Sequence, residues 1–68
     1  MVRFGVGDQV QFNSDFSSTE QCIQVKKGET GIILDKLETD AFANLLIKLS
    51  NKERLLLSED NNILQHYD

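Results

Sequence analysis

Two glycines three residues apart, set between an apolar residue and an apolar run, constrain this chain most. They are Gly28 and Gly31, with Val25 before them and residues 32–34 after them. Glycine adopts positive φ or lets another backbone come close, and β-branched or bulky residues suit a pleated, half-buried surface. The stretch therefore predicts a strand end, a tight turn and a new strand at the pivot of a small barrel.

Alternating apolar and polar side chains predict short strands on either side of this turn. Val10 and Phe12 alternate with glutamines in residues 9–12, which is the period of a strand with one buried face. Residues 22–25 alternate more weakly and lead into the glycines. Residues 63–68 are expected to form the last short strand.

Two leucine-rich runs, residues 45–49 and 54–57, are joined by the polar residues 50–53. A polar connection of this length between apolar runs predicts a hairpin. A helix through both runs is the rival interpretation, because Leu, Lys, Glu and Arg all have good helix propensity.

Leu46 and Leu56 fall outside the alternation of these two runs. Either they cover a second apolar surface, or the strand register is shifted or bulged by one residue. The sequence favours neither alternative. Self-association through this hairpin would be one use for such residues.

Three polar segments are expected to connect the strands. In residues 13–21 two serines are each followed three residues later by Glu or Gln, a capping pattern that predicts a loop holding one helical turn. Residues 35–44 are expected to form a long hairpin loop. In residues 58–62 a serine precedes two acids, which predicts a second short helical turn.

Together these patterns predict an all-β fold. The expected architecture is a small SH3-like barrel of about five short antiparallel strands with one or two short helical turns, forming a single domain over residues 1–68. The one cysteine, Cys22, cannot form an internal disulfide, and we expect it to be a small buried hydrophobe. One Cys and one His are too few for a structural zinc site, so stability must come from the apolar core and from any partner.

Three segments, taken in order, are similar to the SH3-like subdomain inserted in superfamily 1 helicases of the RecD and TraA type. That subdomain carries a Gly-Asp-x-Val strand, a turn with two glycines three apart, and a strand hairpin ending near Leu-x-His. The corresponding residues are 7–12, 25–33, then 46–49 with 54–57, and 64–66. The resemblance covers most of the chain and implies the barrel fold.

The same resemblance implies a possible contact with single-stranded DNA or RNA through Lys26, Lys27 and Lys48. The chain departs from the helicases because it has no phosphate-binding loop and no acidic strand of the Walker type, so no motor activity is implied. Lys27 also stands where the helicase turn usually has Asn.

The net charge argues against a nucleic-acid binder driven by phosphate contacts, and the scarcity of reactive residues argues against an enzyme. Eleven acidic residues against seven Lys and Arg give a formal net charge of -4, the opposite of a phosphate-driven nucleic-acid binder. The one histidine, His66, lies close to the chain end, where a surface position is more common than a general base. The acidic groups lack the spacing and internal glycine of a calcium loop. No catalytic residue, metal site or cofactor is predicted.

We therefore expect a non-enzymatic binding module that docks on a protein partner, with nucleic-acid contact as the alternative. The predicted partner-binding residues lie in three connections of the barrel: Phe16, Lys26, Lys27, Glu29 and Phe42. Homo-oligomerisation is a further expectation. The longest apolar runs have three to five residues and no leader segment is recognisable, which predicts a cytoplasmic protein without a membrane span.

Overall fold

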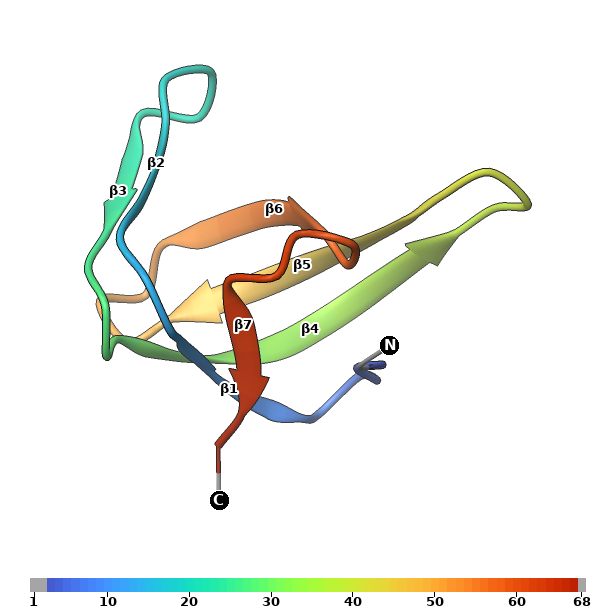
Figure 1. Ribbon diagram of the computed structural model, residues 1–68, viewed down its shortest axis with the longest axis horizontal. Helices are drawn as coiled ribbons and strands as arrows, with labels where there is room; N and C mark the ends of the chain where they lie inside the picture. The colour runs from blue at the N-terminus through green and yellow to red at the C-terminus, as the bar shows by residue number, and fades with distance from the viewer. Residues whose placement is uncertain (1–2, 68) are drawn as a thin grey trace.

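The computed structural model describes residues 3–67. Five strands form one antiparallel sheet in the order β6-β5-β4-β1-β7, and β2 and β3 pair separately as a hairpin (Figure 1). The seven strands of this part of the chain are β1 (Gln9–Phe12), β2 (Phe16–Ser18), β3 (Ile23–Val25), β4 (Thr30–Glu38), β5 (Ala43–Leu49), β6 (Arg54–Ser58) and β7 (Leu64–His66). The described residues include no helix that is long and apolar enough to cross a membrane.

The all-β prediction is confirmed, but the expected five strands and helical turns are wrong for residues 3–67, which form seven strands and no helix. Two of the three capping serines do accept the expected kind of hydrogen bond. Ser18 Oγ accepts from the backbone N–H of Gln21 at 3.3 Å, and Ser58 Oγ accepts from that of Asp60 at 3.3 Å. Each bond closes a turn that leads on to a strand and not to a helix, because no apolar helical stripe follows it.

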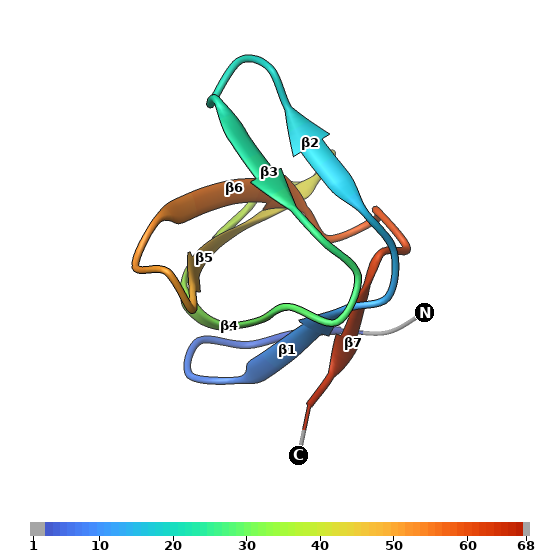
Figure 2. The same cartoon turned by 90° about the vertical axis from the view of Figure 1, so that its left-hand side faces the viewer.

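The sheet curls around one apolar core without closing on itself, and the β2–β3 hairpin lies across its open side (Figure 2). Inward-facing residues of the strands, with Phe4 from the preceding segment, form this core. Its buried members are Phe4, Val10, Phe12, Ile23, Val25, Ile33, Leu45, Ile47, Leu49, Leu55, Leu57 and Leu64. The alternation of apolar and polar residues in β1, β5 and β6 therefore predicted the core face correctly.

The two glycines serve different purposes. Gly28 has φ of 95° in the turn between β3 and β4, where a side chain would be strained. Gly31 lies inside β4 against β5, and a Cβ added there would lie 2.7 Å from Ile47 Cγ2 and 2.9 Å from the carbonyl oxygen of Lys48. Gly28 thus makes the turn, and Gly31 permits the close approach of two strands.

The β4–β5 hairpin is longer than predicted. Pairing continues to Glu38 opposite Ala43, so the expected loop over residues 35–44 shrinks to four residues, 39–42. Polar residues on these strand ends remain in solvent, which is why the sequence resembled a loop. The β5–β6 hairpin is confirmed, and the rival helix through it is wrong. Cys22 is exposed rather than buried, because it occupies the β2–β3 turn with φ of 56°.

A side-chain amide joins the tip of the β2–β3 hairpin to the edge of the sheet. Gln21 Oε1 accepts a 2.8 Å hydrogen bond from the backbone N–H of Leu56, and Gln21 Nε2 donates a 3.0 Å bond to the Leu56 carbonyl oxygen. The amide therefore pairs with β6 as a neighbouring strand would. It ties the hairpin to the sheet and occupies part of an otherwise open edge.

The substitution Gly31→Ala is expected to lower the free energy of unfolding by about 1–3 kcal/mol, because the added methyl group overpacks the β4–β5 contact. Gly5→Ala is the matched control, since its added Cβ would lie 3.7 Å from Asp8 Oδ2, an ordinary contact. Urea unfolding of both variants measures the difference. Equal stability of the two variants would show that the strands separate easily at Gly31.

The substitution Gln21→Ala is expected to cost about 1–2 kcal/mol, because two hydrogen bonds to the β6 backbone are lost. Hydrogen exchange at the Leu56 amide should accelerate with it. Gln24→Ala serves as the control, because the Gln24 side chain makes no hydrogen bond among the described residues. Unchanged protection of the Leu56 amide would contradict the proposed tie.

Candidate functional site

Strands β4, β5 and β6 are apolar on their outer surface as well as on the core side. Leu46 on β5 lies directly opposite Leu56 on β6 in an unshifted register, and Leu56 is 41% exposed. Leu34, at the register shift in β4, and Ile32 are also exposed. Of the two alternatives for Leu46 and Leu56, the second apolar surface is therefore correct. We call Ile32, Leu34, Leu46 and Leu56 the outer face.

A row of side chains crosses the whole sheet beside the outer face. Ile32 pairs with Gln9 on one side and with Lys48 on the other, and Lys48 pairs with Arg54. Beyond Gln9 the row ends at Tyr67, whose backbone N–H donates a 2.9 Å hydrogen bond to the Gln9 carbonyl oxygen. All five side chains are exposed.

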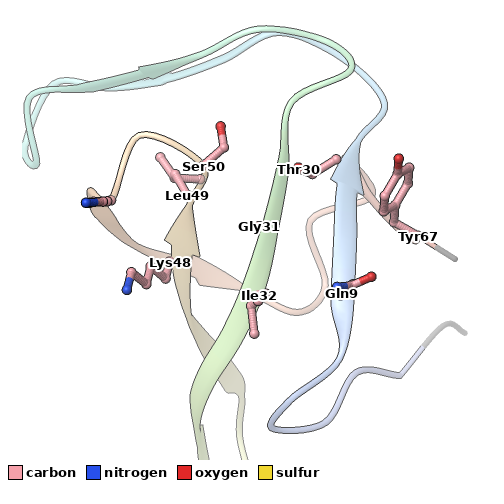
Figure 3. Close-up of a pocket in the computed structure, with 9 residues that line it drawn as sticks. Gln9, Thr30, Gly31, Ile32, Lys48, Leu49, Ser50 and Tyr67 are labelled. Atoms are coloured by element: carbon pink, nitrogen blue, oxygen red, sulfur yellow. The ribbon is translucent and has the colours of Figure 1, made fainter.

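An open groove of about 330 Å³ follows this row (Figure 3). Tyr67 and Lys48 lie on opposite sides of it, with Ile32 and Gln9 between them. Lys52, from the turn after β5, also lines it. We call this groove, lined by Gln9, Ile32, Lys48, Lys52 and Tyr67, the cationic groove.

The positive charge at this end of the sheet is poorly compensated. Lys48 stands directly opposite Arg54, and like charges in such a cross-strand pair are unfavourable. Within residues 3–67, neither of them nor Lys52 forms an ion pair. These three residues are among the seven Lys and Arg of a chain whose net charge is -4. An anionic group bound here would relieve the repulsion.

The backbone of Lys52 is itself unusual. Its φ is 73°, in the left-handed region that Gly or Asn adopts more easily. Lys52 is the last residue of a turn, and its N–H closes that turn by donating a 2.9 Å bond to the Leu49 carbonyl oxygen. The Leu49 N–H also donates to the Glu53 carbonyl oxygen at 2.8 Å, so residues 50–52 form a three-residue hairpin loop. The last position of such a loop usually has glycine. The lysine side chain is therefore present at some cost in stability.

Four of the five predicted partner-binding residues lie around the β3–β4 turn. Lys26, Lys27 and Glu29 lie in that turn, and the Lys27 N–H donates a 2.8 Å bond to Asp15 Oδ1. Phe16 lies in β2 rather than in a loop. It packs partly buried against the core and lines a small hollow together with Lys26.

The other predicted residues lie elsewhere. Phe42 belongs to the β4–β5 loop, and the nine residues of β4, roughly 30 Å of strand, separate that loop from the β3–β4 turn. Phe42 is 50% exposed there (Figure 1 shows this loop projecting from the sheet). Lys48 lies in the cationic groove, whereas Lys26 lines the hollow beside Phe16.

Ile32, Lys52, Arg54 and Tyr67 were not predicted as site residues. The hairpin register would have placed Lys48 near Arg54, because both flank the same short turn. No comparable signal existed for Tyr67 or Ile32. Their positions depend on the pairing of β1 with β7 and with β4, which joins segments far apart in the sequence.

A buried ion pair fixes the segment before β1. Glu59, which is 8% exposed, accepts a 3.0 Å hydrogen bond from the Phe4 N–H and pairs with Lys36 Nζ at 2.9 Å. Lys36 Nζ also donates to the Phe4 carbonyl oxygen at 2.9 Å. The Phe4 N–H, and after it Lys36, lower the pKa of Glu59 below its ordinary value. The group is fully satisfied and therefore structural.

His66 also has a structural environment. Its ring centroid lies 4.6 Å from that of Phe4, and its Nε2 donates to the Arg3 carbonyl oxygen at 3.0 Å. Among residues 3–67, no group of three or more His, Cys, Asp or Glu could hold a metal ion.

No family model, no curated protein and no solved structure matches this chain. The resemblance to the helicase subdomain therefore stays a prediction.

The pKa of Glu59 predicts an acid-sensitive stability. Because the folded-state pKa is lowered, the stabilisation is present above the unfolded-state value of a glutamate, about 4.3, and is lost as the pH falls through the folded value. Glu59→Gln should cost about 1–3 kcal/mol at neutral pH and flatten the acid limb of a stability profile. Glu38→Gln, at an exposed ion pair, should change little. An unaltered acid limb in Glu59→Gln would assign the acid sensitivity to other carboxylates.

Proposed function

We propose that this chain is a small SH3-like barrel that acts as a non-enzymatic protein-docking module or accessory subunit. A curled antiparallel sheet with a hairpin across its open side supports the barrel assignment. The docking surface is the outer face of β4, β5 and β6 together with the adjoining cationic groove.

The observation that carries this proposal is the exposure of apolar side chains on strands whose other face is already the core. Ile32, Leu34 and Leu56 are 36–42% exposed and flank the half-buried Leu46. Strands that are apolar on both faces are typical of sheets covered on both sides. Contiguous apolar surface of this kind marks interaction sites.

Contact with single-stranded DNA or RNA is the second candidate, because Lys48, Lys52 and Arg54 gather beside the exposed ring of Tyr67. Such binding uses aromatic platforms with a basic track along the backbone. The neighbouring outer face is apolar and the chain carries a net charge of -4. Docking of a protein therefore accounts for more of this surface.

The double substitution Leu34→Thr with Leu56→Thr is expected to abolish partner docking while changing stability by less than about 1 kcal/mol, since both side chains are exposed and threonine suits a strand. Cross-linking in a lysate of the source cells, quantified by mass spectrometry, compares the variant with the wild-type protein.

Val6→Thr provides the control, because Val6 is 64% exposed but lies outside the outer face. It should retain the partner. A partner that cross-links equally to the wild-type protein and to both variants would place docking elsewhere on the molecule.

A further inference from the structure

We propose that a second copy of this chain occupies the cationic groove, with the tip of its β4–β5 hairpin as the docking segment. This inference rests on the proposed docking function and names the partner for one part of the surface. The contact joins the two opposite ends of β4, so it is head to tail. The argument depends on the rigidity of the tip, its charge and the chemistry of the groove.

The tip, residues 39–42, is held rigidly by hydrogen bonds around Thr39. The Thr39 N–H donates to the Phe42 carbonyl oxygen at 2.8 Å. Thr39 Oγ1 accepts from the N–H groups of Ala41 at 3.3 Å and of Phe42 at 3.2 Å. The tip therefore presents a half-exposed aromatic ring in a fixed conformation. A preorganised loop loses little conformational entropy when it binds.

The tip is also acidic. Asp40 and Asp60 line the same hollow as Phe42, and neither forms an ion pair within residues 3–67. Glu38 at the base of the tip is paired with Arg3 at 2.8 Å and Lys36 at 3.5 Å. The unpaired charge at this end is thus negative, opposite in sign to that of the cationic groove.

The groove has the complementary chemistry. Tyr67 and Ile32 offer an apolar and aromatic wall for a phenyl ring, and Lys48 and Lys52 offer ammonium groups to a carboxylate. A volume of about 330 Å³ is enough for one or two side chains. An aspartate two residues from a phenylalanine, as in Asp40 and Phe42, supplies both groups at once.

The lysine at position 52 supports this assignment. A residue held at positive φ where glycine would be easier points to a role for its side chain. Docking of Asp40 would place a carboxylate beside Lys52 and beside the repelling pair of Lys48 and Arg54. Attraction between these charges speeds association and weakens with added salt.

The two partner surfaces are different, so the contact is heterologous and can repeat along a chain of molecules. Two variants test this directly. The groove variant carries Lys48→Glu and Lys52→Glu, and the tip variant carries Asp40→Asn and Phe42→Ser. Sedimentation equilibrium from about 10 µM to about 1 mM covers the range of weak association.

We expect the mass of the wild-type protein to rise with concentration and to fall with added salt. Each variant alone should associate at least about tenfold more weakly. An equimolar mixture should form a complex of two molecules and no larger, because the intact tip of the groove variant enters the intact groove of the tip variant. Formation of this complex would also show that both variants are folded. Glu20→Gln, which removes an exposed charge outside the tip, should associate like the wild-type protein.

Three outcomes would overturn the proposal. They are a wild-type protein that stays monomeric throughout, variants that still associate alone, and a mixture that forms no complex. In the first case, a single-stranded oligonucleotide or an acidic peptide that shifts the amide signals of Lys48 and Lys52 would assign the groove to that ligand. If the wild-type protein is monomeric and Leu34→Thr with Leu56→Thr still abolishes binding of a partner, the docking function stands. The second copy is then not the occupant of the groove.

Discussion

The inner face of one curled sheet has to supply most of the apolar burial in this molecule. At 68 residues the chain buries only about 60% of the surface that it exposes when unfolded. One cysteine cannot form a disulfide within the chain. The sheet must therefore curl far enough to bring β6 and β7 around a single core, and Gly31 permits the close approach of β4 and β5 within it. The β2–β3 hairpin covers the open side, and Gln21 fixes its tip to β6.

Local patterns predicted the elements whose two faces differ. Alternation identified β1, β5 and β6, and the positive φ of Gly28 matches the predicted turn. The patterns failed where most residues of a strand are polar, as at β2 and at the end of β4, because no clear alternation of apolar and polar residues marks such strands. The serine caps predicted helical turns that did not form. A capping hydrogen bond is local, and a helix also needs an apolar stripe along the residues that follow.

The surface was harder to predict than the core. Membership of the core follows from alternation within each strand, whereas neighbours on the outer surface follow from register between strands. Lys48 and Arg54 share one hairpin and could have been paired from the sequence. Tyr67 reaches the groove only because β7 pairs with β1, in a register that joins Gln11 to Gln65, 54 residues apart in the sequence. Phe42 was correctly expected in a connection, but the length of β4 separates it from the β3–β4 turn.

The buried ion pair connects stability to the proposed assembly. Lys36 pairs with Glu59 and with Glu38, so one ammonium group joins the base of the β4–β5 hairpin to the turn after β6. Glu59 lines the same hollow as Asp40 and Phe42. Protonation of Glu59 would remove one of the three partners of Lys36 Nζ, which are Glu59, Glu38 and the Phe4 carbonyl oxygen, and so weaken the support beneath the tip. A small contact binds more tightly when its parts lose little conformational freedom on binding. The tip should therefore dock best in the pH range where Glu59 is ionised.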